Sequence, residues 1–156
     1  MNGIKLHSKF STLRQVVGTL EKGVILEARR AFADEDIFTY AKVTGDFNPL
    51  HFDGESAKCA GFEDRLVPGM LVATLFPQII SSHFPGAVYA AQTLNFRGPV
   101  YVGEEVKATV EATHLRSSNG RYVAKFLCTC WKNGSVAIDG QSITIIPTLD
   151  IAKFDH

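Results

Sequence analysis

This chain lacks a net charge and any long apolar run. Sixteen basic and sixteen acidic side chains cancel among its 156 residues, so no overall field favours nucleic acid or an anionic membrane surface. The longest apolar runs, such as residues 69–76, are far shorter than the roughly 20 residues needed to span a bilayer. Neither a nucleic-acid partner nor a membrane span is therefore expected.

Cysteine is scarce and occurs only as Cys59, Cys128 and Cys130. An odd number without a C-x-x-C spacing argues against a secreted disulfide framework and favours reduced thiols inside a cell or organelle. In a strand, Cys128 and Cys130 would share one face, where core packing is the expected role. Asp46, His51 and Asp53 lie near one another in the sequence, but no other histidine has the spacing to complete a metal site, so no metal is expected.

The N-terminal residues have few acids and several cations. Lys5, Lys9 and Arg14 stand among Ser and Thr, and no acid precedes Glu21. This composition is typical of an organelle transit peptide or its remnant, and a flexible tail fits it nearly as well. We expect residues 1–20 to be such a flexible segment or transit-peptide remnant, and residues 21–156 to form a single domain.

Hydrophobic periodicity predicts the order of the elements. Residues 23–32 favour a strand that leads into a helix, which opens with acids and ends at Gly45. Residues 69–82 are apolar on almost all sides and predict a buried helix that Pro77 kinks or shortens. Four antiparallel strands are then expected over residues 88–97, 104–116, 121–132 and 136–146, with tight turns at 118–120 and 133–134. A sheet wrapped around one apolar helix satisfies this order, so the fold class is α+β.

Between the two predicted helices lies a long irregular stretch, residues 46–68, with one short helix expected near residues 54–59. Loops of this length in a compact domain are usually functional. Asp46 follows a helix end, and Asn48-Pro49 forces a turn before His51. The turn allows a carboxylate and an imidazole to converge on one small molecule, such as water, for acid–base chemistry. The spacing alone is only suggestive, because Asp-x-Asn-Pro is also an ordinary turn sequence and a loop histidine is usually just solvated.

A second candidate feature opens the predicted buried helix at Val67-Pro68-Gly69. Proline at a helix start leaves unpaired backbone N–H groups there, and such groups suit a carbonyl oxygen that gains negative charge during a reaction. A glycine allows close approach to the backbone. Gly69 is therefore the candidate donor.

The run Gly45-Asp46-Phe47-Asn48-Pro49-Leu50-His51, with Val67-Pro68-Gly69-Met70-Leu71, resembles the MaoC-like hydratase/dehydratase family. The likeness extends from about Val24 to Pro147. The kin that it suggests are R-specific enoyl-CoA hydratases and the mitochondrial 3-hydroxyacyl-thioester dehydratases of type II fatty acid synthesis. The resemblance implies a hot-dog fold, in which a curved antiparallel sheet surrounds a long central helix, assembly as a homodimer, and a mitochondrial location.

The resemblance also implies roles for individual residues. Asp46 and His51 correspond to the family's catalytic pair, and the amide of Gly69 meets the thioester carbonyl. Many relatives carry histidine before this glycine, where this chain has Pro68, but a backbone role for Gly69 should survive that change. The implied reaction is reversible loss of water from a (3R)-3-hydroxyacyl thioester of acyl carrier protein or CoA. The thioester itself acidifies the C2 proton, so no cofactor is expected.

The remaining candidates concern substrate binding and competing functions. The candidate binding residues are Asn48, Arg65, Met70, Leu71 and Arg97, of which the arginines would meet phosphates of the carrier. Leu71, Leu75, Phe76 and Ile79 are candidate acyl-chain contacts, although plain core packing is the commoner role. Gln92 falls on an otherwise apolar strand face and must find hydrogen-bond partners there. Two alternatives stay open, a hot-dog acyl-thioesterase and a non-catalytic acyl-binding subunit.

Overall fold

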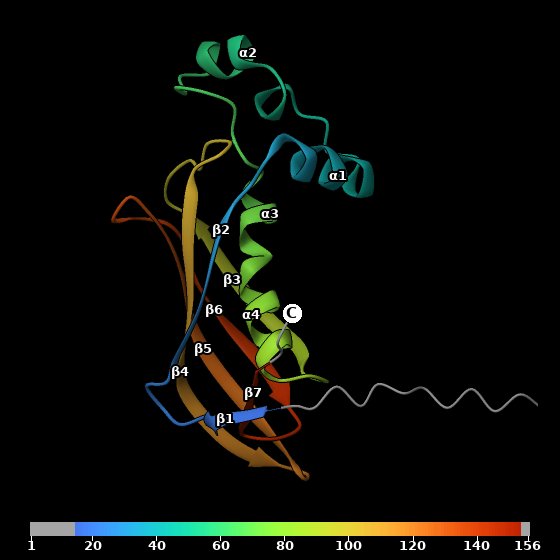
Figure 1. The fold of residues 1–156 in the computed structure, drawn as a ribbon, viewed down its shortest axis with the longest axis vertical. Coiled ribbons are helices and arrows are strands. Elements are labelled where there is room, and N and C mark those ends of the chain that lie inside the picture. The colour runs from blue at the N-terminus through green and yellow to red at the C-terminus, as the bar shows by residue number, and fades with distance from the viewer. Residues whose placement is uncertain (1–14, 154–156) are drawn as a thin grey trace, which may run out of the picture.

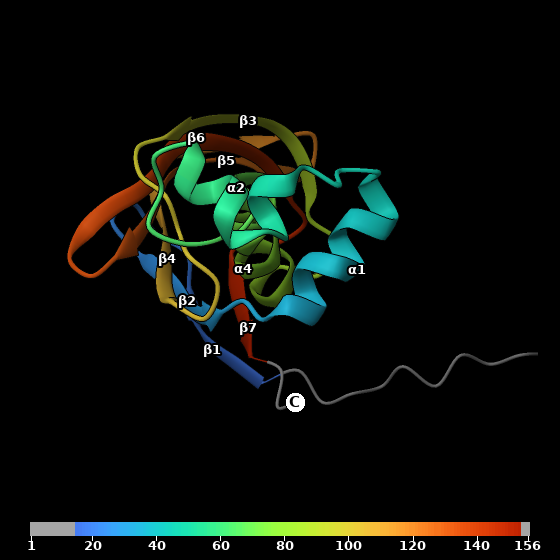
Figure 2. The ribbon, with the colours of Figure 1, turned by 90° about the horizontal axis from the view of Figure 1, so that it is seen from above.

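A curved antiparallel sheet encloses a central pair of helices in the computed structural model, which describes residues 15–153 (Figures 1 and 2). The strand order is β2-β4-β5-β6-β3. The strands are β2 (Ile25–Ala31), β3 (Val88–Phe96), β4 (Glu105–Ser118), β5 (Arg121–Lys132) and β6 (Ser135–Ile146). These bounds confirm the predicted strands to within a few residues. The arrangement is the expected α+β hot-dog fold.

The predicted central helix is present as two consecutive helices, α3 (Gly69–Ala73) and α4 (Leu75–His83), with a break at Thr74. Pro77 explains the break, because it has no N–H to donate to the carbonyl of Ala73, four residues earlier. The expected interruption is thus confirmed, and it lies one turn before the proline. Most apolar residues of the two helices are buried, as expected, whereas Met70 at the start of α3 is 55% exposed.

The core lies between these helices and the concave face of the sheet. Val106, Ala108, Val110 and Ala112 alternate along β4 and are completely buried, as their period-two spacing predicted. Cys128 and Cys130 of β5 are buried on the same face as free thiols. Positive φ angles at Asn119 and Asn133 confirm the two predicted tight turns.

Three short elements cross one end of the central helices (Figure 2). Helix α1 (Asp34–Thr44) has three acids in its first turn and ends at Gly45, whose N–H donates to the carbonyl of Ala41 from a left-handed backbone with φ 78°. The 3₁₀ helix η1 (Pro49–His51) and helix α2 (Gly54–Cys59) follow. Both α1 and α2 agree with the sequence, whereas η1 was not predicted.

A second, two-stranded sheet joins the two ends of the described chain. Strand β1 (Gln15–Thr19) pairs antiparallel with β7 (Asp150–Lys153), and the buried Leu20 follows β1. Sequence analysis missed both strands and placed residues 15–20 in a flexible segment. The rest of that segment, residues 1–14, lies outside the described residues. No helix within residues 15–153 is long and apolar enough to cross a bilayer.

Candidate active site

A cleft of about 360 Å³ opens where the start of α3 meets the end of β3. Its walls are mostly apolar. The lining residues are His51, Phe62, Leu66, Val67, Gly69, Val72, Phe96, Arg97, Gly98, Pro99, Val100 and Ile138. The cleft therefore combines an apolar slot with one imidazole and one helix start, which is the usual composition of a small-molecule site.

His51 reaches this cleft through the turn that the sequence predicted. Asn48 caps η1 by accepting a hydrogen bond from the N–H of Leu50, at 3.1 Å. The rings of Phe47 and Phe52 stack across the turn, with centroids 6.0 Å apart. Within this turn His51 is buried, with 9% of its surface exposed.

The imidazole of His51 is oriented by a backbone acceptor. Its Nδ1 lies 2.8 Å from the carbonyl oxygen of Leu66. Because a carbonyl only accepts, Nδ1 must carry the proton of this hydrogen bond. In the neutral ring Nε2 then has a free lone pair, and this nitrogen faces Asp46.

Asp46 stands opposite, with its Oδ2 at 3.7 Å from Nε2 of His51. That separation is longer than a direct hydrogen bond, so both groups remain free to bond to the same small molecule. The other carboxylate oxygen accepts the N–H of Asn48 at 3.2 Å, which fixes the side chain to its own turn. Burial raises the pKa of the nearby Tyr40, and the negative charge of Asp46 contributes a smaller increase.

Gly69 begins α3 with Pro68 as its N-cap. The N–H groups of Leu71 and Val72 both bond to the carbonyl of Pro68, whereas the N–H of Gly69 has no acceptor among residues 15–153. A Cβ at this position would lie 2.6 Å from Cε1 of Phe96. The absence of a side chain thus lets Phe96 close the cleft wall beside a free N–H.

The structure brings only part of the predicted binding set to the cleft. Arg97 lines it and forms an ion pair with Asp139, at 2.8 Å between Nε and Oδ2; hydrogen bonding to Arg97 lowers the pKa of Asp139. Arg65 instead bonds to Asp34 at 2.7 Å.

The other candidates lie around the cleft rather than in its wall. The side chain of Asn48 is engaged in its own turn, and Met70 is exposed beside Gly69. Leu71 lines a separate hollow against α1. The apolar candidates Leu75, Phe76 and Ile79 are core residues.

Sequence reasoning missed most of the apolar lining. Phe96 and Ile138 face each other across β3 and β6, and Val72 joins them from α3. Phe96 has the same parity along β3 as Gln92 and so belongs to the face that the sequence predicted to be apolar, but no sequence signal indicated which helix residue would lie against it.

Most of this chain is similar in sequence to proteins of one known family. The family model described as MaoC like domain matches residues 15–126. A protein of Arabidopsis thaliana called mitochondrial 3-hydroxyacyl-[acyl-carrier-protein] dehydratase is 53% identical, over 86% of this chain and 82% of its own length. The corresponding protein of Solanum lycopersicum, called FERN, is 50% identical over 90% of this chain and 86% of its own length.

A solved structure supports the same assignment. The (R)-hydratase of Aeromonas caviae, described as involved in PHA biosynthesis, superposes with a TM-score of 0.77 at 34% identity, covering 82% of this chain and 98% of its own. The family match covers well over half of the sequence, and the curated relatives match along most of their length. The chain belongs to the MaoC-like family.

Proposed function

We propose that this protein is a hydro-lyase that interconverts (3R)-3-hydroxyacyl and trans-2-enoyl thioesters, as a dehydratase of mitochondrial type II fatty acid synthesis. One observation carries the chemistry: His51 Nε2 and Asp46 Oδ2 lie 3.7 Å apart beside a cleft whose wall includes the free N–H of Gly69. The relatives named as dehydratases and hydratases act by addition or loss of water, which is what this arrangement suits.

In this proposal the thioester carbonyl accepts the N–H of Gly69. Removing the C2 proton moves negative charge onto that oxygen, and a fixed donor there lowers the barrier. Asp46 and His51 take the C2 proton and supply a proton to the C3 hydroxyl, which departs as water. Over one complete reaction, Asp46 and His51 together neither gain nor lose a proton. In the hydration direction the same two acceptors hold the incoming water.

The proposal is tested by following the ultraviolet absorbance of enoyl-CoA substrates. Asp46→Asn and His51→Ala should each lower kcat by about 10²–10⁴-fold, because each removes one half of the acid–base assistance. Glu63→Gln, which changes an exposed carboxylate in the following loop, is the control and should keep full activity. Wild-type activity in both variants would overturn the assignment.

The two alternatives give different results in the same assay. A thioesterase releases one free thiol for each thioester consumed, detected with a disulfide reagent, whereas hydration releases none. A non-catalytic acyl-binding subunit gives no product, and its Asp46→Asn and His51→Ala variants behave like the wild type. The separated acceptors of Asp46 and His51, placed to share one water, favour hydration.

The proposed carrier is acyl carrier protein or CoA. Of the two predicted arginines, Arg97 lines the cleft and its side chain is 56% exposed, so it is the candidate contact for a carrier phosphate. Arg97→Ala should raise KM for the carrier-linked substrate more than it lowers kcat. The mitochondrial location follows the names of the Arabidopsis and Solanum relatives, and imaging of a C-terminal fluorescent fusion tests it.

A further inference from the structure

Leu66 lies between the candidate catalytic histidine and the loop that leads into the sheet, and it is bonded on both sides. Its carbonyl accepts the Nδ1 proton of His51 at 2.8 Å, and its N–H donates to the carbonyl of Leu50 at 2.9 Å. On its other side Leu66 forms an antiparallel bridge with Tyr101. The orientation of the His51 ring therefore depends on where this one backbone carbonyl is held.

The geometry of the bridge explains why the carbonyl of Leu66 points at His51. The two backbone hydrogen bonds of the bridge, of 2.8 and 3.2 Å, join the chain neighbours of Leu66 to the chain neighbours of Tyr101. In an antiparallel pair of this kind, the N–H and C=O of the paired residues themselves point away from the other strand. Leu66 therefore turns both groups away from Tyr101 and towards the turn that carries His51.

Three side chains hold the segment around Tyr101 in place. The hydroxyl of Tyr101 accepts the backbone N–H of Glu63 at 3.2 Å, and the backbone N–H of Tyr101 donates to Oε2 of Glu104 at 2.8 Å. Lys132 places its ammonium 3.2 Å from the same carboxylate oxygen and 4.8 Å from the centroid of the Tyr101 ring. We call the side chains of Tyr101, Glu104 and Lys132 the loop anchor.

The charges of the loop anchor are paired and partly enclosed. The side chains of Lys132 and Glu104 are 18% and 29% exposed, whereas those of the ion pair between Lys58 and Glu55 on α2 are 59% and 81% exposed. Limited access of water strengthens both an ion pair and a cation–π contact. Lys132 ends β5, which is the central strand of the five-stranded sheet. The loop anchor thus fastens the loop that holds His51 to the middle of the sheet.

We propose that the loop anchor positions His51 for catalysis by holding residues 63–67 against the sheet. The carbonyl of Leu66 then keeps Nε2 of His51 turned towards Asp46. The inference rests on the proposed function and adds positioning residues to it, since no residue of the loop anchor lines the cleft. A displacement of about 1 Å at a reacting group can cost about 10²-fold in rate. Loss of the anchor should therefore lower kcat and change KM little.

Two substitutions at Tyr101 test this with enoyl-CoA hydration. Tyr101→Leu removes the ring and the hydroxyl but keeps the backbone bridge, and it should lower kcat by about 10–100-fold. Tyr101→Phe keeps the ring beside Lys132 and loses only the acceptor for the N–H of Glu63, so it should restore most of the activity.

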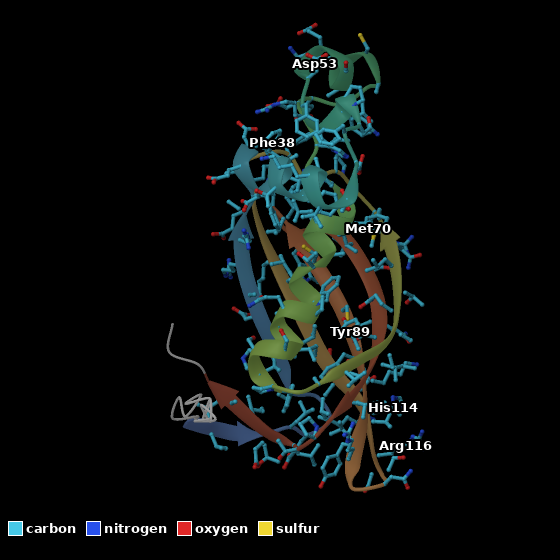
Figure 3. The ribbon with its side chains drawn as sticks, turned by 90° about the vertical axis from the view of Figure 1, so that its right-hand side faces the viewer. Phe38, Asp53, Met70, Tyr89, His114 and Arg116 are labelled. Carbon is cyan, nitrogen blue, oxygen red and sulfur yellow. The ribbon has the colours of Figure 1, made fainter. Side chains whose placement is uncertain are left out.

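Tyr122→Leu is the matched control, because Tyr122 is also a partly buried aromatic residue. It pairs with Ser117, next to Arg116, and Arg116 lies at the end of the molecule opposite Asp53 (Figure 3). The control should keep the wild-type kcat. Urea unfolding of both leucine variants separates a loss of stability from a loss of kcat.

A double substitution distinguishes positioning from a general structural role. If the loop anchor acts only through His51, adding Tyr101→Leu to His51→Ala should lower kcat no further, because the effects of residues that act as one unit do not add. Independent, multiplicative losses in the double variant would overturn the inference.

Nitrogen-15 NMR gives a readout that does not need turnover. The wild type should show a slowly exchanging Nδ1 proton that is absent from His51→Ala; Tyr101→Leu should lose this signal and Tyr122→Leu should retain it. If Tyr101→Leu does not fold, Lys132→Met, which removes only the ammonium, should weaken the signal and lower kcat. A folded anchor variant with the wild-type kcat and signal refutes the inference and leaves the proposed function intact. Wild-type activity in His51→Ala removes the proposed function and, with it, the catalytic role of the anchor.

Discussion

Gly69 shows how a single missing side chain shapes the site. A Cβ there would lie 2.6 Å from Cε1 of Phe96, which is well inside van der Waals contact. The ring of Phe96 can therefore reach the start of α3 only because this residue is glycine, and the same absence leaves the N–H accessible from the cleft.

Gly69→Ala should displace the ring of Phe96 and narrow the approach to the N–H. Overpacking of this kind costs about 1–3 kcal/mol, and we expect kcat/KM for enoyl-CoA to fall by about tenfold or more. Gly54→Ala is the matched control, since its Cβ would be 3.9 Å from the nearest atom, Oδ1 of Asp64. Full activity in Gly69→Ala would contradict the role given to this position.

At the residue scale, the sequence predicted those contacts of the site that depend on local chain geometry. Asp46 and His51 are separated by one turn, so their spacing alone indicated that they could converge, and the structure places them 3.7 Å apart. The hydrogen bond from His51 to the carbonyl of Leu66 and the approach of Phe96 to Gly69 join distant parts of the chain. No local pattern specifies such contacts.

At the element scale, the paired strands β3 and β6 approach each other unusually closely at Gly140. The Cβ of any residue at Gly140 would meet the carbonyl oxygen of Thr93. Strand β3 also carries a bulge between Tyr89 and Ala91, which bends a strand locally. Beside this close approach, Nε2 of Gln92 donates to the carbonyl of Gln141 at 3.2 Å.

Gly140→Ala should force β3 away from β6. We expect the free energy of unfolding in urea to fall by about 3 kcal/mol, at the upper end of overpacking costs, because the clash is with backbone and not with a flexible side chain. Gly18→Ala, in β1, has only an ordinary contact of 3.9 Å with Ile151 and should be neutral or slightly stabilising. Equal effects of the two changes would refute this account.

Helices and strands with a local sequence signal could be predicted, whereas strands that depend on a distant pairing partner could not. Strands β3 to β6 and helix α1 have strong periodicity or end signals, and all were found from the sequence. Strand β1 is five residues long and pairs with β7, from which most of the chain separates it. Its stability comes from that distant partner, so neither strand has a recognisable local signal.

At the scale of the whole molecule, β3 is an edge strand of nine residues. Val88, Phe96 and the neighbouring Met70 are each about half exposed. A long apolar edge favours pairing with another strand. We propose that two copies of the chain pair through β3.

Light scattering should therefore give twice the chain mass of 17.1 kDa. Ala90→Pro should produce the monomer, because Ala90 lies at the bulge, where proline is tolerated within the sheet but removes an edge donor. Ala90→Thr keeps the N–H and should remain dimeric. A wild-type protein with the mass of one chain would exclude this pairing.

The small sheet of β1 and β7 ties the beginning and the end of the described chain together at the pole opposite α1 and α2 (Figure 1). Deleting β1 removes the pairing partner of β7, and deleting β7 removes the partner of β1. Truncations that reach this sheet from either end should therefore cause a similar loss of stability. The described chain enters and leaves the fold at the end of the molecule opposite the segment that carries Asp46 and His51.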